Sequence, residues 1–275
     1  MPELPEVESV ARSLRPRLVG RTVERIETSG LSLRQPIDRA RLEAACVGAR
    51  VDGVVRVGKY LLVELSRGEV LLAHLGMSGH FAFSDGDTRR EPHTHLVLAL
   101  NGGDELRYVD ARRFGLLVVH RSDAILRSPE LAGLGPDPLS QTFTPDYLAA
   151  CLAESRGVAV KNFLLDQRRI AGLGNIYVSE ALHVAGISPR RLACNVDAGR
   201  AERLHRAIVA VLSSSVERRG TTFRNYVDAD GAIGENQHHL TVYGRDGEPC
   251  RACQTPIRRI VQGARSTFFC PRCQR

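Results

Sequence analysis

The first residues of the chain combine a proline with several acids. Once Met1 is removed, Pro2 carries a secondary amine at the chain start, and Glu3 follows it directly. An α-amino group titrates near ~8 and lysine near ~10.4, so this nitrogen is the better nucleophile at neutral pH. The alternative is structural, because proline favours the first turn of a helix and Glu3, Glu6 and Glu8 complement the helix dipole. These residues alone favour the structural interpretation.

Lysine is almost absent from the chain. Of 38 Lys and Arg residues, only Lys59 and Lys161 are lysine. The general explanation is a coding bias that uses arginine wherever a positive charge suffices. Under such a bias, the remaining lysines are candidates for work that a guanidinium cannot do, such as proton transfer or fitting an ammonium into a tight site.

Four cysteines near the C-terminus have the spacing of a metal site. Cys250, Cys253, Cys270 and Cys273 form a C-x2-C-x16-C-x2-C pattern, which is typical of a tetrahedral four-cysteine zinc site. Disulfides are the weaker alternative, because nothing indicates export and the other three cysteines are scattered. The spacing predicts one zinc ion, with a hairpin between the two cysteine pairs.

The same C-terminal segment is strongly basic. Residues 249–275 contain no Asp or Glu and six arginines: Arg251, Arg258, Arg259, Arg265, Arg272 and Arg275. A solvated surface is the alternative, but an unbalanced cationic hairpin more often contacts phosphate.

Two glycine-flanked turns carry side chains that could enter a base stack. Residues 75–80 include Met77, and residues 110–115 include Phe114. Such side chains could fill the gap that remains when a base is extruded from duplex DNA. The alternative, that both are core residues at strand ends, is favoured without other evidence.

A third turn, residues 171–177, joins two expected helices. Its glycines would let backbone amides and the Asn175 side chain approach a phosphate.

Composition limits the class of protein. A chain of 275 residues is long enough for about two domains, and a net charge of +7 favours an acidic partner such as nucleic acid or an anionic surface. No apolar run is long enough to cross a bilayer, and the acidic N-terminus is unlike a signal peptide. We expect a cytosolic protein.

The hydrophobic pattern changes along the chain. A helix is expected at about 5–18, and apolar runs with turn signals between them indicate a β-sandwich or barrel up to residue 120. Gly and Pro in 133–140 predict a linker, and the following pattern is helical, at about 144 onward, 158–170, 176–185 and 198–219. We therefore expect an α+β multidomain protein with segments 1–132, 133–141 (the linker), 142–228 and 229–275.

Together these motifs resemble bacterial formamidopyrimidine-DNA glycosylases. The resemblance spans nearly the whole chain, in the family's order. It is carried by the zinc finger and by PELPEVE (2–8), GKYLL (58–62), HLGMSG (74–79), DARRFG (110–115), GLGNIYVSEAL (172–182) and VYGR (242–245).

The resemblance implies a bifunctional glycosylase and abasic-site lyase that excises oxidised purines, chiefly 8-oxoguanine and formamidopyrimidines, in base excision repair. Pro2 would attack C1′ and form an imine, and Glu3 would act as general acid and base. Lys59, which matches a lysine that the family carries on a strand, would aid β-elimination, and Arg265 would bind phosphate and aid δ-elimination. Glu6 would support the opening helix and a bound water.

The resemblance also implies how double-stranded damaged DNA is held. Side chains that enter the gap would be Met77, Arg112 and Phe114, and contacts to phosphate or near the lesion would be His93, Arg156, Lys161 and Asn175. The implied fold is an N-terminal helix with a β-sandwich, a helix-two-turn-helix domain and a C-terminal β-hairpin zinc finger, with DNA between the domains. Zinc would be structural, since four thiolates leave no open position. A monomer in the bacterial cytosol or nucleoid is expected.

Two departures and two alternatives remain. Relatives have proline at Ala111, and the loop 231–240, with Thr221, Thr222 and Arg224 before it, differs where the family closes over the flipped base. Lesion preference is therefore open. An endonuclease VIII-type enzyme for oxidised pyrimidines is disfavoured by Leu4 and the DARRFG turn. A DNA-binding module without catalysis is disfavoured by the intact Pro2, Glu3 and Lys59.

Overall fold

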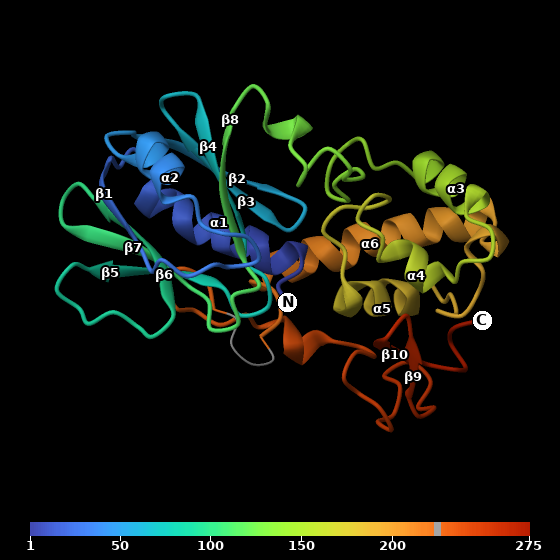
Figure 1. Cartoon of the computed structure of the whole chain (residues 1–275). Coiled ribbons are helices and arrows are strands. Elements are labelled where there is room, and N and C mark those ends of the chain that lie inside the picture. Colours follow the sequence, from blue (N-terminus) through green and yellow to red (C-terminus); the bar gives the residue numbers. More distant parts are fainter. Residues whose placement is uncertain (223–226) are drawn as a thin grey trace. The chain divides into compact units, whose positions relative to one another are not determined.

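The computed structural model describes residues 1–222 and 227–275 (Figure 1). Its first compact unit contains residues 1–132 and 218–235, and its second contains residues 133–217 and 236–275. The segment boundaries given above remain a prediction.

The first unit contains two four-stranded antiparallel sheets. One has the order β1-β6-β7-β5 and the other the order β2-β3-β4-β8. The strands are β1 (Val23–Thr28), β2 (Val51–Val57), β3 (Tyr60–Leu65), β4 (Glu69–His74), β5 (His80–Asp85), β6 (Thr94–Leu100), β7 (Asp104–Val109) and β8 (Leu116–Arg121). This confirms the β-sandwich, in which tight turns at 66–68 and 101–103 join β3 to β4 and β6 to β7.

Helix α1 (Leu4–Leu18) packs on the core of the sandwich (Figure 1). Its buried apolar residues recur with helical spacing, so one face joins the side chains of both sheets in a single core. Val10, Leu14 and Leu18 are fully buried. This packing fixes the start of the chain to the sandwich, as the sequence predicts.

A short helix, α2 (Arg39–Cys46), lies in a region where only strands were expected. The Asp38 side chain accepts a hydrogen bond from the backbone N–H of Arg41 and so caps it. Three buried residues in eight give a weak amphipathic signal, which explains the omission.

The second unit is mainly helical, with α3 (Pro145–Glu154), α4 (Val160–Leu164), α5 (Asn175–Val184) and α6 (Ala198–Glu217). Thr144 caps α3, because its hydroxyl accepts a hydrogen bond from the backbone N–H of Tyr147. Figure 1 shows α6 running alongside α3 and α5.

The helix expected at 158–170 is wrong in its extent, because α4 ends at Leu164. Asp166 accepts a hydrogen bond from the backbone N–H of Arg168, and Gln167 donates to the carbonyl oxygens of Leu165 and Leu173. These side chains bond to the backbone in place of the helical ladder.

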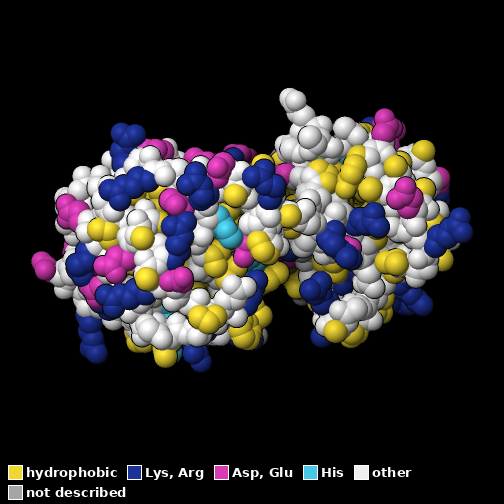
Figure 2. Space-filling view, turned by 45° about the horizontal axis from the view of Figure 1, so that its top comes forward, with side chains coloured by type: hydrophobic (Ala, Val, Ile, Leu, Met, Phe, Trp, Pro, Cys, Tyr) yellow, Lys and Arg dark blue, Asp and Glu magenta, His cyan; other side chains and the backbone are white. Residues whose placement is uncertain are grey.

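The C-terminal segment is a two-stranded hairpin, β9 (Arg258–Gln262) and β10 (Arg265–Phe269). Gly263 and Ala264 form its turn with φ of 54° and 58°. The α+β fold class is thus confirmed. None of the helices in 1–222 and 227–275 combines the length and apolar character needed to span a membrane. On the face drawn in Figure 2, basic and acidic side chains are intermixed over both units.

Candidate active site and DNA interface

The start of α1 is held by a reciprocal pair of acids. Glu3 is the N-cap, and its side chain accepts from the backbone N–H of Glu6, while the Glu3 N–H donates to the Glu6 carboxylate at 2.7 Å. Both side chains are nearly inaccessible to solvent, and Pro2, one residue earlier, is half-buried. The helix start therefore fixes the backbone next to the predicted nucleophile.

Glu6 also reaches the segment after α6 that belongs to the same unit. Its other carboxylate oxygen accepts from the backbone N–H of Thr221 at 2.7 Å. Gly220 has a φ of +76°, and a Cβ atom there would lie 2.7 Å from that oxygen. Glycine is thus required both by the backbone conformation and by the space. Arg224, which was named with Thr221 and Thr222 before the loop 231–240, lies outside the described residues.

Lys59 lies in the two-residue turn between β2 and β3, not on a strand as the resemblance implied. Gly58 before it has a φ of +58°, which suits a tight hairpin. Lys59 is only 8% exposed. The turn thus holds a nearly buried lysine at the end of the sheet, which sets Lys59 apart from an ordinary exposed surface charge.

His74, at the end of β4, is a residue that the sequence analysis missed. It pairs with Tyr60 across the sheet and packs edge-on against its ring. Burial, followed by the charges of Arg34, Lys59 and the chain's N-terminus, lowers the pKa of His74 to about 3. His74 is therefore neutral at pH 7, and the N-terminus and Lys59 both belong to its electrostatic surroundings. Its place as the first residue of the HLGMSG motif was the signal available.

The two turns with candidate gap-filling side chains lie against each other. A Cβ atom on Gly76 would lie 2.5 Å from the carbonyl carbon of Phe114, and the Arg112 guanidinium lies 4.7 Å from the centre of the Phe114 ring. Met77 and Phe114 are 46% and 45% exposed. The alternative that they are core residues is therefore wrong.

Asp110 organises both turns. Its carboxylate, fully buried, accepts from the hydroxyl of Ser78 at 2.5 Å and from the backbone N–H groups of Arg112 and Gly115. The Asp110 carboxylate accepts all three hydrogen bonds, and they fix the turn without a proline at Ala111.

His93 and Arg156 are both exposed but belong to different units. His93 has a φ of +67°, and its carbonyl oxygen accepts from the backbone N–H of Asp110 at 3.0 Å. Arg156 lies in the connection between α3 and α4.

Two predicted DNA contacts, Lys161 and Asn175, converge on β10 in the second unit, and β10 itself carries Arg265. Lys161 Nζ donates to the hydroxyl of Thr267 at 2.6 Å and to the carbonyl of Ser266 at 3.4 Å. Asn175 donates to the same Ser266 carbonyl at 2.8 Å. Burial, then the charge of Arg265, lowers the pKa of Lys161 to about 8. Residues from α4, α5 and β10 therefore form one cationic cluster at the finger's base.

The four cysteines of the finger meet the requirements of zinc. Their sulfur atoms lie within 4.8 Å of one another, with Cys250 Sγ 3.9 Å from Cys273 Sγ and Cys253 Sγ 3.4 Å from Cys270 Sγ. A tetrahedron with Zn–S bonds of about 2.3 Å requires sulfurs about 3.8 Å apart. Hydrogen bonds involving Thr255 lower the pKa of Cys253 to about 6, whereas burial raises the pKa of Cys270 and the hydrogen bond with Cys253 raises that of Cys273 to about 12. The assignment of zinc therefore rests on the sulfur geometry.

A second residue that the sequence analysis missed, His183 of α5, lies beside this cluster. Its Nε2 is 3.6 Å from Cys250 Sγ, and its Nδ1 is 3.0 Å from the Thr241 hydroxyl. Glu180, one turn earlier, accepts from that hydroxyl and from the backbone N–H groups of Thr241, Val242 and Tyr243. The finger is thereby attached to α5, which also carries Asn175.

Three family models match successive parts of the chain. They are the formamidopyrimidine-DNA glycosylase N-terminal domain (residues 1–117), the formamidopyrimidine-DNA glycosylase H2TH domain (134–227) and the zinc finger found in FPG and IleRS (247–275). The chain belongs to the formamidopyrimidine-DNA glycosylase family. Similar relatives include the formamidopyrimidine-DNA glycosylases of Geobacillus kaustophilus, 45% identical with both chains fully covered, and of Symbiobacterium thermophilum, 48% identical over all of this chain and 89% of that protein.

Solved structures of formamidopyrimidine-DNA glycosylases have the same fold. MutM (Fpg) from Thermus thermophilus is 42% identical, with a TM-score of 0.88 and coverage of 99% of this chain and 98% of that one. A Lactococcus lactis Fpg mutant in complex with Fapy-dG-containing DNA is 34% identical, with a TM-score of 0.93 and full coverage of both chains. These relatives confirm the family, the fold and the zinc finger with one structural zinc ion.

Proposed function

We propose that this protein is a bifunctional DNA glycosylase and abasic-site lyase of base excision repair that excises oxidised purines. The observation that carries the proposal is the start of α1, where the reciprocal Glu3–Glu6 cap fixes the residue next to Pro2. Burial and Arg34 are the largest causes of the lowered pKa of His74, and Lys59 and the Met1 amino group add to it. A nucleophilic amine, a buried acid and a nearly buried ammonium are thus present in one unit.

The first chemical step is substitution at C1′ of the damaged nucleotide. After Met1 is removed, the nitrogen of Pro2 forms a bond to C1′ while the bond from C1′ to the base breaks. Opening of the sugar ring then gives an imine between Pro2 and C1′. Glu3, 4% exposed, exchanges protons with the sugar as this happens.

Elimination follows from the imine. The imine acidifies the protons on C2′, and loss of one of them expels the 3′ phosphate; a second elimination expels the 5′ phosphate. Lys59 aids the first elimination, and Arg265 holds phosphate and aids the second. Lysine suits the first role because its ammonium can lose and regain a proton, which a guanidinium cannot do.

Each unit contributes its own contacts to double-stranded DNA. In the first, Met77, Arg112 and Phe114 enter the gap left by the flipped nucleotide, with Arg112 facing the orphaned base, and His93 contacts phosphate near the lesion. In the second, the contacts are Arg156, Lys161, Asn175 and Arg265. The exposure of Met77 and Phe114 and the clustering of Lys161 with Asn175 support these roles.

Substrate preference is carried over from the relatives. The Lactococcus lactis protein was crystallised with Fapy-dG DNA and a MutM with carbocyclic 8-oxo-G DNA, so we infer formamidopyrimidines and 8-oxoguanine for this chain. Because its proposed partner is damaged chromosomal DNA, we infer that the protein acts in the bacterial cytosol, at the nucleoid.

A panel of short duplexes tests the proposal. Each carries 8-oxoguanine, a formamidopyrimidine, an oxidised pyrimidine, an abasic site or no damage. We expect incision of both purine lesions and the abasic site, with phosphate left on both sides of the gap. Preference for the pyrimidine would identify an endonuclease VIII-type enzyme, and damage-specific binding without incision would identify a binding module.

A further inference from the structure

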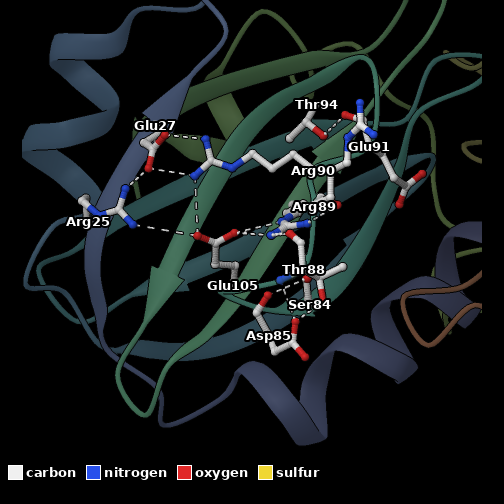
Figure 3. A network of polar contacts seen from close by, with 11 residues as sticks. Arg25, Glu27, Ser84, Asp85, Thr88, Arg89, Arg90, Glu91, Thr94 and Glu105 are labelled. Atoms are coloured by element: carbon white, nitrogen blue, oxygen red, sulfur yellow. Dashed lines mark hydrogen bonds and ion pairs between the residues drawn. The ribbon is translucent and has the colours of Figure 1, made fainter.

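The connection between β5 and β6 is tied down by a network of arginines and acids on the sheet β1-β6-β7-β5. Figure 3 shows Arg25, Glu27, Arg90 and Glu105 linked across β1, the connection and β7. The connection ends at His93, a proposed DNA contact.

Arg107 of β7 is the member that holds the backbone of the connection. Its guanidinium donates to the carbonyl oxygens of Thr88 at 2.9 Å and Arg89 at 3.4 Å. It is also paired with Glu105 at 2.8 Å, and the two side chains are only 4% and 5% exposed. A planar group with several fixed donors is needed to reach both carbonyls and the carboxylate at once.

A second set of contacts is made by Arg90, the residue after Arg89. Arg90, which belongs to the connection itself, makes two hydrogen bonds to the Glu27 carboxylate at 2.5 and 2.9 Å. Its guanidinium is also 3.6 Å from Glu105. Arg25, by contrast, contacts the carboxylates of Glu27 on β1 and Glu105 on β7, which lie outside the connection.

The end of the connection is fixed by the turn that carries Arg112 and Phe114. His93 adopts the left-handed region, and its carbonyl oxygen accepts from the backbone N–H of Asp110. A histidine in that conformation needs support from its surroundings. The network holds the connection at residues 88–90, and Asp110 holds it at His93.

We propose that Arg107 is a positioning residue for DNA binding, which sets the backbone of the connection so that His93 meets phosphate. This rests on the proposed function, which makes His93 a DNA contact. Arg90 acts with it from the connection's side.

The test is a double-mutant cycle on DNA affinity. Arg107→Lys keeps the charge but lacks the planar set of donors, His93→Ala removes the contact, and Arg25→Lys is the matched control at the edge of the network. Dissociation constants are measured with an abasic-site analogue duplex, and kcat and KM with 8-oxoguanine DNA. Thermal unfolding reports on the fold, and Arg90→Gln is the second variant should Arg107→Lys not fold.

We expect Arg107→Lys, or Arg90→Gln, and His93→Ala each to weaken binding about tenfold, as loss of one charge-assisted contact does, with a raised KM and an unchanged kcat. The double variant should bind no worse than His93→Ala, and Arg25→Lys should bind as wild type. Wild-type affinity in both network variants, or additive losses, would overturn the inference alone. Wild-type affinity in His93→Ala would overturn both this inference and the proposed phosphate contact of His93. The proposed chemistry at Pro2 is tested separately, by trapping the covalent intermediate with borohydride.

Discussion

Glu3 and Glu6 cap the first helix reciprocally, through the 2.7 Å hydrogen bond from the Glu3 backbone N–H to the Glu6 carboxylate and the return bond to the Glu3 side chain. The same Glu6 carboxylate accepts from Thr221. One buried acid therefore links the residue after the proposed nucleophile to the segment that follows α6 within the first unit.

Replacement of Glu6 by glutamine should weaken both links. The amide has one acceptor oxygen where the carboxylate has two, so one of the buried N–H groups of Glu3 or Thr221 faces an NH2 group. We expect the free energy of unfolding to fall by about 1–3 kcal/mol and base excision in a single turnover to slow. Denaturant titration and rapid quench measure these. Glu24→Gln, a change at an exposed position on β1, should alter neither stability nor the excision rate. Equal effects in the two variants would contradict the linking role of Glu6.

The lowered pKa of Lys161 predicts a pH dependence of DNA binding. Its ammonium is protonated below pH 8 and loses its charge above it, and phosphate binding requires the charged form. Affinity should therefore fall by up to tenfold per pH unit above about pH 8. Lys161→Met should bind more weakly but lack this component. Parallel pH profiles of the two proteins, measured by fluorescence anisotropy, would contradict the assignment.

His74 predicts a component of acid instability. Because its pKa is about 3 in the folded protein and 6.5 when unperturbed, the unfolded state binds a proton that the folded state does not between those values. Stability from this group is complete above pH 6.5 and falls by up to ~1.4 kcal/mol per pH unit below it. His74→Gln should show a shallower loss between pH 6.5 and 5 in urea titrations; an equal slope would exclude His74 as the cause.

His183 predicts how firmly zinc is held. In the zinc-bound finger Cys250 is a thiolate, which only accepts, so Nε2 of His183 carries the ring proton and donates to it. Nδ1 then accepts from the Thr241 hydroxyl, whose single proton turns away from Glu180, and Glu180 keeps its three backbone N–H donors. Loss of such a partner commonly lowers metal affinity by roughly 10–100-fold. His183→Phe should release zinc to a colorimetric chelator faster than the wild type and than His239→Gln, whose side chain is exposed. Equal release rates in all three would show that His183 serves packing alone.

The sequence predicts the parts with local signals. The finger follows from cysteine spacing, α1 from its apolar face, and the strands from runs between turn residues. The α4 boundary is different, because Asp166 and Gln167 end the helix through side-chain bonds to a turn that only the folded chain forms. Lys59 is nearly buried in the β2–β3 turn, and no pattern in the neighbouring residues predicts that burial.

His74 and His183 were missed for the same reason. Each is a single histidine within an apolar run, and its partners, Arg34 and Lys59 in one case and Cys250 in the other, are distant in sequence. The convergence of Lys161 and Asn175 on the Ser266 carbonyl, next to Arg265, likewise depends on the packing of α4 and α5 against β10. Family motifs name such residues, but only tertiary structure brings them together.

The most direct test of the central claim is borohydride trapping on 8-oxoguanine DNA followed by peptide mass spectrometry. We expect a reduced covalent adduct on the nitrogen of Pro2, with Met1 absent, and no adduct in a Pro2→Gly variant whose N-terminal amine is blocked by acetylation. An adduct on Lys59 or another residue, or trapping that persists in the blocked variant, would contradict it.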